Sequence, residues 1–502
     1  MSTARTLGRN TAARYGALAV DALVGLVLLP YNLGHLGAED YGLWILSATV
    51  ARYVSFLDLG FGGGLVRFVA ECRATGDSRR LSEIASTVFA AFSVAGVAAL
   101  AIMGGVALAY DRLFAVEAAQ AEVGRTVLLV VAARLALGLP LSVFGAVING
   151  AQRYAMNNAV AIVTTLAAAA ANVIAIERGG GVLAVVVATT AVHLLAYVAY
   201  VVNAYRVQPD LTVSPRLASL ARLREVGAFS GYLLVLDWSH KVNYSLDTFV
   251  IGWALGPRAV SLFTPSVRVA QTMRDLTAQF HSVLFPAVVD LGTRGDHRRL
   301  VTLLIEGTRL STALALAVGL GVIVLAEPLL VAWVGPSVAS SAAVLQVLAL
   351  SMLIRVGQAT GATILKGAGG HRYLAANNAA VAACNLALSV ALVGRLGILG
   401  VALGTAIPVS VGSVFIVPRA CRRLGVPVRR FWREAIWPVL WPALPAAVAL
   451  WVGRETLEPN HVVTVLACGG AAAALYLGLV YGFGLTPDAR ATLQARLRAA
   501  VA

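Results

Sequence analysis

The chain has 502 residues; 59% are hydrophobic and only 13% carry a charge, against about 25% in a typical soluble domain. The mean hydropathy is +0.81. A soluble protein of this length would form about three domains, and 39 basic plus 24 acidic residues are too few to cover their surfaces. The composition excludes a soluble enzyme, a disordered chain and a secreted disulfide scaffold. It predicts a polytopic membrane protein.

The net charge of +15 comes almost wholly from arginine. In a membrane protein such an excess belongs to the loops that set topology, so we expect no nucleic-acid partner. The four cysteines lie far apart, and the sequence has neither a CxxC pattern nor a His/Cys cluster. No loop carries a phosphate-binding P-loop motif. We therefore expect no metal site and no cofactor.

A helix needs about 20 apolar residues to cross the hydrocarbon core. The runs found here are about twice as long as barrel strands and rich in Ala, Leu and Gly, which predicts an all-α membrane protein. About fourteen spans are predicted, and in chain order they are 15–34, 41–69, 84–109, 125–148, 158–176, 182–203, 228–252, 260–291, 303–325, 341–365, 375–395, 397–418, 435–453 and 461–484.

The basic residues fall mainly on one side of the predicted membrane. With a cytoplasmic N-terminus, 25 of the 39 basic residues face the cytoplasm, six lie in the opposite loops and eight lie inside spans. Lys and Arg concentrate in cytoplasmic loops of membrane proteins. The sequence therefore predicts that both termini are cytoplasmic.

An internal repeat divides the chain. Residues 145–159 read GAVINGAQRYAMNNA and residues 361–379 read GATILKGAGGHRYLAANNA, so that their RY pairs are offset by 219 residues. Chance likeness between small-residue helices would explain the Ala and Gly matches, but it explains the RY and NN matches poorly. An even number of helices separates the matches, which predicts two six-helix halves in the same orientation, as a parallel repeat. The predicted parts are an N-terminal six-helix bundle (1–203), a cytoplasmic linker (204–226), a C-terminal six-helix bundle (227–418), and a basic loop with two extra transmembrane helices and a cytoplasmic tail (419–502).

The segment YGLWILSATVARYVSFLDLGFGGGLVRFVAE, residues 41–71, resembles the second helix of polysaccharide flippases. These belong to the multidrug/oligosaccharidyl-lipid/polysaccharide exporter superfamily, and the YGLW start, the DLG patch and the GAQRY…NN loop carry the resemblance. It covers roughly residues 10–420. The resemblance implies that the protein moves an undecaprenyl-diphosphate-linked glycan to the outer leaflet of the bacterial inner membrane, for surface polysaccharide biosynthesis. Its implied partners are this lipid-linked glycan, membrane lipids, and a polysaccharide polymerase or other membrane proteins of the assembly pathway.

Charged residues inside spans are costly and usually face a water-filled path. One interpretation is structural pairing. Asp237 and Lys241 lie four residues apart on one helix face and would neutralise each other, and Arg268 shares a face with Asp275. Under this interpretation the charges hold helices together and bind no substrate.

The alternative is a cationic central cavity that binds a diphosphate during alternating access of the two halves. Guanidinium groups suit this role because their planar fork binds phosphate oxygens two at a time. The candidate substrate-binding residues are Arg52, Arg134, Lys241, Arg268, Arg274 and Arg355. The candidates for ion coupling are Asp21, Asp58 and Asp237.

Two other functions compete with a flippase. A drug or cation antiporter of the same superfamily should have an acidic cavity. Here the charged residues far from the ends of the predicted spans comprise six bases and four acids. A membrane enzyme of glycan assembly needs paired carboxylates or a sizeable loop, and the outer loops have only about 5–15 residues. We therefore expect a flippase and not an enzyme.

Overall fold

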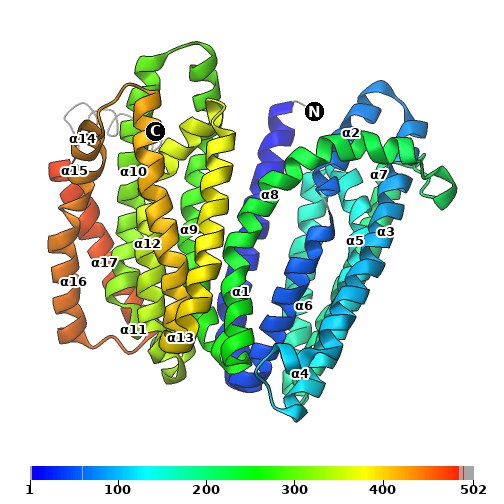
Figure 1. Ribbon diagram of the computed structural model, residues 1–502, viewed down its shortest axis with the longest axis horizontal. Coiled ribbons are helices and arrows are strands. Elements are labelled where there is room, and N and C mark those ends of the chain that lie inside the picture. The colour runs from blue at the N-terminus through cyan, green and yellow to red at the C-terminus, as the bar shows by residue number, and fades with distance from the viewer. Residues whose placement is uncertain (1–2, 59, 485–489, 491–502) are drawn as a thin grey trace. The chain divides into compact units, whose positions relative to one another are not determined.

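The computed structural model describes residues 3–58, 60–484 and 490; within them, the side chains of residues 3–9, 11–12, 229–245, 276, 279, 282–283 and 371 are not described. The described chain is helical and contains no strand. It divides into two compact units, Met1–Ser261 and Leu262–Ala502, called the N-terminal and C-terminal units below. Figure 1 shows long helices running alongside one another in each unit.

The helices follow each other with short connections. Those of the N-terminal unit are α1 (Thr3–Val54), α2 (Phe61–Thr75), α3 (Ser78–Leu108), α4 (Tyr110–Leu113), α5 (Ala118–Gly150), α6 (Tyr154–Glu177), α7 (Val182–Val207) and α8 (Leu220–Leu255). After α9 (Pro257–Thr293), which begins at the unit boundary, come α10 (His297–Val324), α11 (Ala326–Val334), α12 (Ala342–Gly367), α13 (His371–Arg423), α14 (Val428–Phe431), α15 (Trp437–Leu440), α16 (Ala443–Leu457) and α17 (Val462–Leu479). The segments Trp432–Ile436 and Val480–Gly484 are π-helical.

The described residues contain ten helices that are long and apolar enough to cross a membrane, by length and composition. The predicted count of fourteen is not confirmed by this criterion. Two of the ten, Ala13–Asp58 and Arg372–Arg423, each cover two predicted spans in whole or in part. The predicted spans 228–252 and 260–291 lie in α8 and α9, whose side chains are described only in part.

The predicted span 41–69 is wrong as a single helix. Helix α1 ends at Val54, and α2 begins only at Phe61, after Gly60 adopts the left-handed conformation with φ 71°. The Gly60 N–H donates a hydrogen bond to the Asp58 carboxylate at 3.0 Å, which closes a tight turn. The apolar run predicted a continuous helix because the break depends on Asp58 and Gly60 acting together.

Helix α1 reverses direction at Gly37, whose φ of 81° and ψ of 167° interrupt the helix. Before this point, Asn10 donates to the carbonyl of Gln152, just before α6, and Tyr31 donates to Glu177, at the end of α6. The first arm of α1 therefore follows α6 from one end to the other. The second arm returns alongside it (Figure 1).

Helix α13 is also a hairpin. Its arms are joined by hydrogen bonds that nest around Gly397, namely Tyr373 to Phe415, Thr405 to Asn385, and Ser389 to Val401. Nested pairs mean that the two arms run antiparallel. The predicted spans 375–395 and 397–418 are these two arms, and Gly397 makes the turn with φ 59°.

The internal repeat is confirmed by backbone geometry. Gly37 and Gly256 lie 219 residues apart and share nearly the same φ and ψ, 81° and 167° against 82° and 177°. Asp77 and Asp296 have the same offset, and each side chain caps the helix that follows by accepting a backbone N–H at 2.9 and 3.1 Å. Equivalent turns and caps in both halves are what a structural repeat requires.

The turns that lead into the helices with the RY motifs repeat as well. After α5, Ala151, Gln152 and Arg153 donate to the carbonyls of Val147, Asn149 and Ile148. After α12, Ala368, Gly369 and Gly370 donate to the carbonyls of Ile364, Lys366 and Leu365. The two turns thus have the same hydrogen-bond pattern.

An ion-pair network joins the start of α8 to α2 and α3. Arg80 contacts Glu71 at 2.9 Å and Glu225 at 2.6 Å, and Arg222 contacts Glu83 at 3.0 Å and Glu225 at 2.8 Å. Arg222 and then Arg80 lower the pKa of the Glu225 carboxyl. Helix α8 also packs against α1, α2 and α3. The predicted division into two six-helix bundles remains a prediction.

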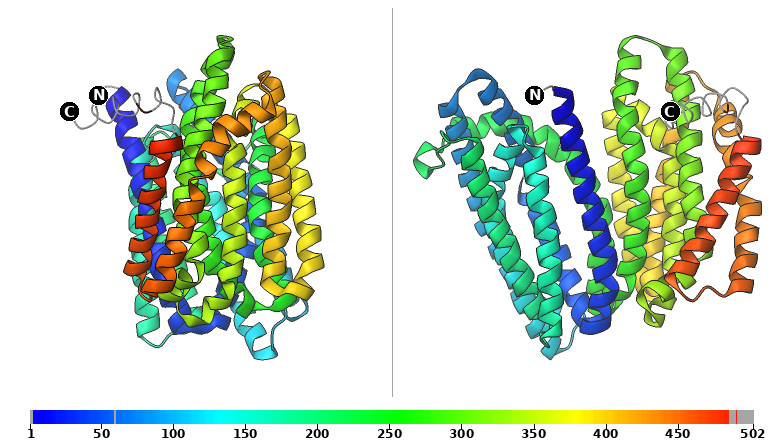
Figure 2. Two further views of the ribbon diagram at one scale, coloured as in Figure 1. Left: turned by 90° about the vertical axis from the view of Figure 1, so that its left-hand side faces the viewer. Right: turned by 180° about the vertical axis from the view of Figure 1, so that it is seen from behind.

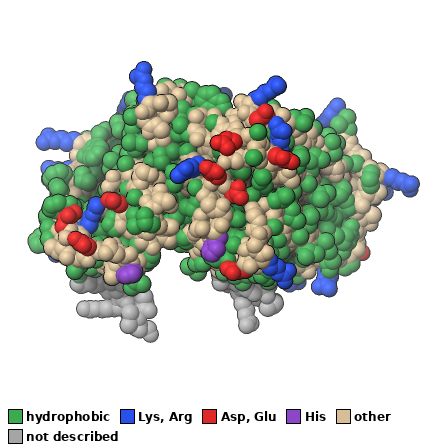
Figure 3. Space-filling view, turned by 90° about the horizontal axis from the view of Figure 1, so that it is seen from below, with side chains coloured by type: hydrophobic (Ala, Val, Ile, Leu, Met, Phe, Trp, Pro, Cys, Tyr) green, Lys and Arg blue, Asp and Glu red, His purple; other side chains and the backbone are tan. Residues whose placement is uncertain are grey.

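The opposite end of the N-terminal unit carries separate polar contacts. Gln120 donates to Glu39 at 2.6 Å, and Arg125 pairs with Asp111 at 2.7 Å. Figure 3 looks onto the lower end of the view in Figure 1 and shows acidic side chains scattered among hydrophobic ones.

The last helices of the chain pack inside the C-terminal unit. Ala313 and Leu316 of α10 belong to one buried cluster with Val439, Ala446 and Tyr476. The Tyr476 hydroxyl donates to the carbonyl of Val439 at 2.8 Å. Figure 2 shows α16 and α17 side by side at the edge of the unit. The two added helices are therefore part of the folded unit.

Candidate functional site

The N-terminal unit contains a cavity of about 1000 Å³, called the large cavity below. It is lined by parts of α1, α2, α5, α6 and α7. Its lining is rich in amide and phenol groups, among them Asn149, Gln152, Tyr154, Asn158, Tyr197 and Tyr200. Amides and phenols both donate and accept hydrogen bonds, so this lining can solvate a neutral polar ligand.

Small residues and local hydrogen bonds shape the large cavity. A side chain at Gly138 would come within 2.4 Å of the Tyr197 hydroxyl oxygen, so only glycine leaves room for that ring. The Asn157 amide donates to the carbonyl of Gly145 and to the side-chain oxygen of Asn149, both at 2.8 Å. Asn157, in the NN motif, therefore holds the start of α6 against the end of α5.

A smaller cavity of about 210 Å³ lies next to the large one. Asp21, Arg134, Asn172 and His193 line it, on α1, α5, α6 and α7. Arg134 interacts electrostatically with Tyr197, which lines the large cavity. The two cavities thus form neighbouring parts of one polar region inside the unit.

The structure brings together some of the predicted site residues of the N-terminal unit. Asp21 and Arg134 line the small cavity, and Asp58 lines the large cavity together with Arg14. Arg52 is exposed on α1 and is not among the lining residues of either cavity. The small cavity is therefore mixed in charge, with an acid from α1 and a base from α5 in its lining.

The predicted arginines of the C-terminal unit lie on two helices. Arg268 and Arg274 are on α9 and Arg355 is on α12, all half-buried. The Arg274 guanidinium pairs with Asp275 at 3.1 Å. Asp275, predicted to share a face with Arg268, thus has an ion pair with its sequence neighbour.

Asp237 and Lys241 lie in α8 outside the described side chains. Their predicted pairing, and the coupling role of Asp237, are therefore outside the described residues. The cationic central cavity and the ion-coupling roles of Asp21 and Asp58 stay predictions.

The sequence analysis missed the neutral polar residues. It searched for charges inside spans, because these are costly in a membrane, whereas Tyr197 and Tyr200 are ordinary residues of an apolar helix. The available signal was the RY…NN motif, since Tyr154, Asn157 and Asn158 all line the large cavity. Among the described residues, no group of three His, Cys, Asp or Glu side chains could hold a metal ion.

The sequence profile of a family described as "polysaccharide biosynthesis protein" matches residues 36–360. The chain belongs to this family. The match runs from the turn of α1 into α12 and covers the YGLW and DLG elements and the first RY…NN loop. The family resemblance to polysaccharide flippases of the exporter superfamily is thereby confirmed.

Individual relatives agree with the family. The probable flippase AglR of Haloferax volcanii is 22% identical over 428 residues, covering 83% of this chain and 85% of the relative. The lipid II flippase MurJ in an inward closed conformation superposes with a TM-score of 0.73 at 12% identity, covering 94% of this chain and 98% of MurJ. An inward-facing multidrug resistance MATE transporter superposes with a TM-score of 0.63 at 16% identity, covering 82% of this chain and 97% of the transporter. The two structures show a shared fold, and together with the family match they identify a multi-pass membrane flippase or transporter.

Proposed function

We propose that this protein moves an oligosaccharide or polysaccharide precursor linked to undecaprenyl diphosphate across the bacterial inner membrane. The precursor passes from the cytoplasmic to the outer leaflet, for surface polysaccharide biosynthesis. The observation that carries the proposal is the large cavity, whose amide and phenol groups suit a sugar head group. Membership of the polysaccharide biosynthesis family and the similarity to a probable flippase support it.

The physical problem is the head group. Each hydroxyl costs about 4–8 kcal/mol on transfer to an alkane-like interior, and a five-sugar unit carries on the order of ten hydroxyls, so unaided crossing is negligible. A cavity whose side chains both donate and accept replaces the hydrogen bonds lost from water. The lipid tail stays in the bilayer while the cavity opens to the two sides in turn.

The diphosphate needs a cation and a driving force. Arg134 supplies a guanidinium beside the large cavity, and Arg14 lines the cavity itself. An inside-negative potential favours export of an anion by about 2.3 kcal/mol per charge per 100 mV, or roughly 5 kcal/mol for two charges. The potential is therefore a sufficient driving force without nucleotide hydrolysis.

The proposal is tested with proteoliposomes that contain an undecaprenyl-diphosphate-linked oligosaccharide. A glycosidase that cannot cross the membrane reports how fast the glycan appears outside. We expect Arg134→Ala to slow this appearance by about tenfold or more, the value of one strong charge-assisted contact. The control is Arg258→Ala, which changes an exposed arginine in the first turn of α9 and should stay near the parent rate. Equal rates for both variants would mean that Arg134 does not bind the substrate during transport.

A cation-coupled drug antiporter is the second candidate, because Asp21 lines the small cavity and the fold is shared with a MATE transporter. Arg134 in the lining of the same cavity opposes it, since a guanidinium repels a cationic drug. Efflux of a cationic dye that depends on a proton or sodium gradient, and that Asp21→Asn abolishes, would favour the antiporter. Glycan flipping without dye efflux would favour the flippase.

A further inference from the structure

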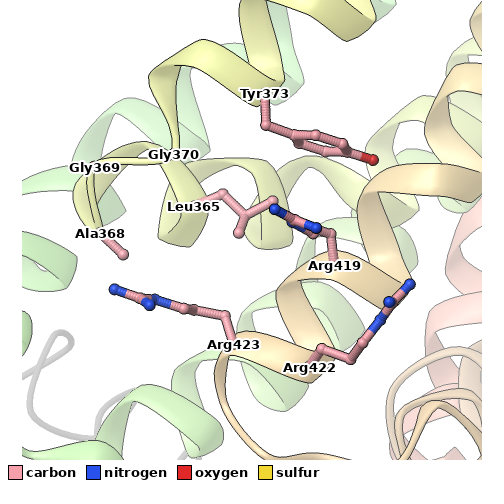
Figure 4. Close-up of a pocket in the computed structure, with 8 residues that line it drawn as sticks. All are labelled: Leu365, Ala368, Gly369, Gly370, Tyr373, Arg419, Arg422 and Arg423. Atoms are coloured by element: carbon pink, nitrogen blue, oxygen red, sulfur yellow. The ribbon is translucent and has the colours of Figure 1, made fainter.

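The C-terminal unit contains a cavity of about 470 Å³, called the basic pocket below (Figure 4). It is lined by Leu365, the turn Ala368–Gly370, Tyr373, and the arginines Arg419, Arg422 and Arg423. The turn joins α12 to the first arm of α13, and the arginines end the second arm. Its volume is within the range of about 300–1,000 Å³ that is typical of small-ligand sites.

The side chains of the basic pocket are held in place. The Arg419 guanidinium lies over the Tyr373 ring, 5.0 Å from its centre, and the Tyr373 hydroxyl donates to the carbonyl of Phe415 at 3.0 Å. In Figure 4, Arg419 and Arg423 extend toward the turn, whereas Arg422 points to the other side. Two guanidinium groups therefore border one side of the turn.

The turn leaves space beside these arginines. Gly369 has φ 80°, a conformation that favours glycine, and a side chain added there would meet no atom within 4 Å. Without a side chain, the backbone borders the pocket and does not fill it. A ligand can approach the two guanidinium groups from this side.

The pocket has a large excess of positive charge. Segments 365–374 and 418–434 carry eight basic residues and a single acid, Glu434, which pairs with Arg430 at 3.1 Å. Within the described part of the chain, Arg419, Arg422 and Arg423 form no ion pair with a carboxylate. The electrostatics of the pocket therefore call for an anionic ligand.

Exposed apolar side chains lie close in sequence to the arginines of the basic pocket. Phe415, one helical turn before Arg419, is 61% exposed, and Trp432 is 51% exposed. Large apolar and aromatic side chains exposed next to arginines are typical of the boundary between acyl chains and head groups. This setting favours an anion that is joined to a lipid.

The arginines are particular to the second half of the repeat. The equivalent turn after α5 has the same backbone hydrogen bonds and adjoins the large cavity. There, α7 contributes Tyr197 and Tyr200 to the lining in place of arginines. The internal repeat therefore accounts for the shape of the turn after α12. The arginines beside this turn have no counterpart among the residues that α7 contributes to the lining of the large cavity.

We propose that the basic pocket binds the phosphodiester head group of an anionic glycerophospholipid at the membrane surface. Arg419 and Arg423 bind the phosphate oxygens, and the acyl chains lie along the exposed apolar face of α13. This site is separate from the large cavity and does not depend on which substrate is transported.

The test uses the full chain in detergent micelles and measures binding of phosphatidylglycerol by native mass spectrometry. The variant Arg419→Gln/Arg423→Gln should bind this lipid at least about tenfold more weakly than the parent protein. Each basic residue near a lipid surface usually contributes about 1 kcal/mol. The matched control, Arg429→Gln/Arg433→Gln, removes the same charge from exposed arginines outside the pocket and should change binding by less than about twofold. Phosphatidylcholine with the same acyl chains should bind weakly to every form. Equal melting temperatures without added lipid establish that both variants fold.

Four outcomes would overturn the proposal. If both double variants weakened lipid binding equally, the lipid would be attracted by the overall positive charge of this region and not by the basic pocket. Unchanged binding in the pocket variant would place the lipid elsewhere. Competition by millimolar inorganic phosphate would assign the pocket to a soluble phosphate compound. Preference for undecaprenyl diphosphate over phosphatidylglycerol, lost in the pocket variant, would assign it to the transported lipid.

Discussion

Arg309 shows how a single residue inside a span can serve the fold and not transport. Its side chain is 5% exposed; Nε and Nη2 donate to the carbonyl of Glu434, the former at 2.8 Å, and Nη1 contacts Glu306 at 3.0 Å. Glu434 belongs to the π-helical segment Trp432–Ile436. Arg309 thus fastens the start of the added C-terminal helices to α10.

Removing this side chain should destabilise the protein. Arg309→Ala leaves the carbonyl of Glu434 without its charged donor, and we expect a loss of about 2–3 kcal/mol. The melting temperature in detergent measures it. Arg299→Ala, an exposed arginine in the first turn of the same helix, is the control and should cost under about 1 kcal/mol. A melting temperature for Arg309→Ala equal to that of the control would contradict the fastening role.

At the scale of elements, glycines decide where the long apolar runs turn. Gly37 and Gly397 reverse α1 and α13, and Gly60 separates α1 from α2. The predicted boundaries before and after Gly37 and Gly397 were close to the observed arms. The break at Gly60 was missed because a local hydrogen bond to Asp58 made it, within a run of otherwise suitable composition.

The two repeat-related glycines should respond differently to substitution. Gly37→Ala introduces backbone strain of about 1–3 kcal/mol, since φ 81° and ψ 167° suit only glycine, but it adds no clash because nothing lies within 4 Å of the new side chain. Gly256→Ala adds a clash, since its Cβ would lie 2.4 Å from the carbonyl oxygen of Ala115. Melting temperatures of the two variants compare these costs directly. A larger loss for Gly37→Ala than for Gly256→Ala would contradict the packing around Gly256.

At the scale of the whole molecule, the distribution of arginine predicts orientation. Residues 204–226, around the connection of α7 to α8, carry four arginines, and residues 419–433, from the end of α13 to the π-helical segment, carry six. The connection between α16 and α17 carries none after Arg454. Because basic loops are retained in the cytoplasm, these two kinds of connection should lie on opposite sides of the membrane.

Cysteine labelling in intact cells tests this orientation. In a cysteine-free background, Asn460→Cys should react with a maleimide that cannot cross the membrane, and Asp210→Cys should react only after the cells are opened. Both positions are exposed, so reactivity reports the side of the membrane. Reaction of Asp210→Cys in intact cells would reverse the predicted topology.

Much of the fold and part of the candidate site could be predicted from the sequence. Hydropathy indicated the helices, because a membrane requires long apolar runs, and the RY…NN motifs indicated the repeat. Asp21 and Arg134 were found because charges in apolar runs stand out, and both line the small cavity. Tyr197 was not found, since an aromatic residue in an apolar helix gives no signal until packing places it beside a cavity.

The sequence by itself determined a helical membrane protein with an internal repeat and a flippase-like family. These properties follow from composition, spacing and motifs, which are local and can be read along the chain. Only the tertiary structure decided that α1 breaks before Gly60, that Arg309 is buried, and that Arg419 and Arg423 meet the turn after α12. The break in α1 depends on a local hydrogen bond and a left-handed glycine. The positions of Arg309, Arg419 and Arg423 depend on which side chains meet across helices distant in sequence, and hydropathy encodes neither kind of feature.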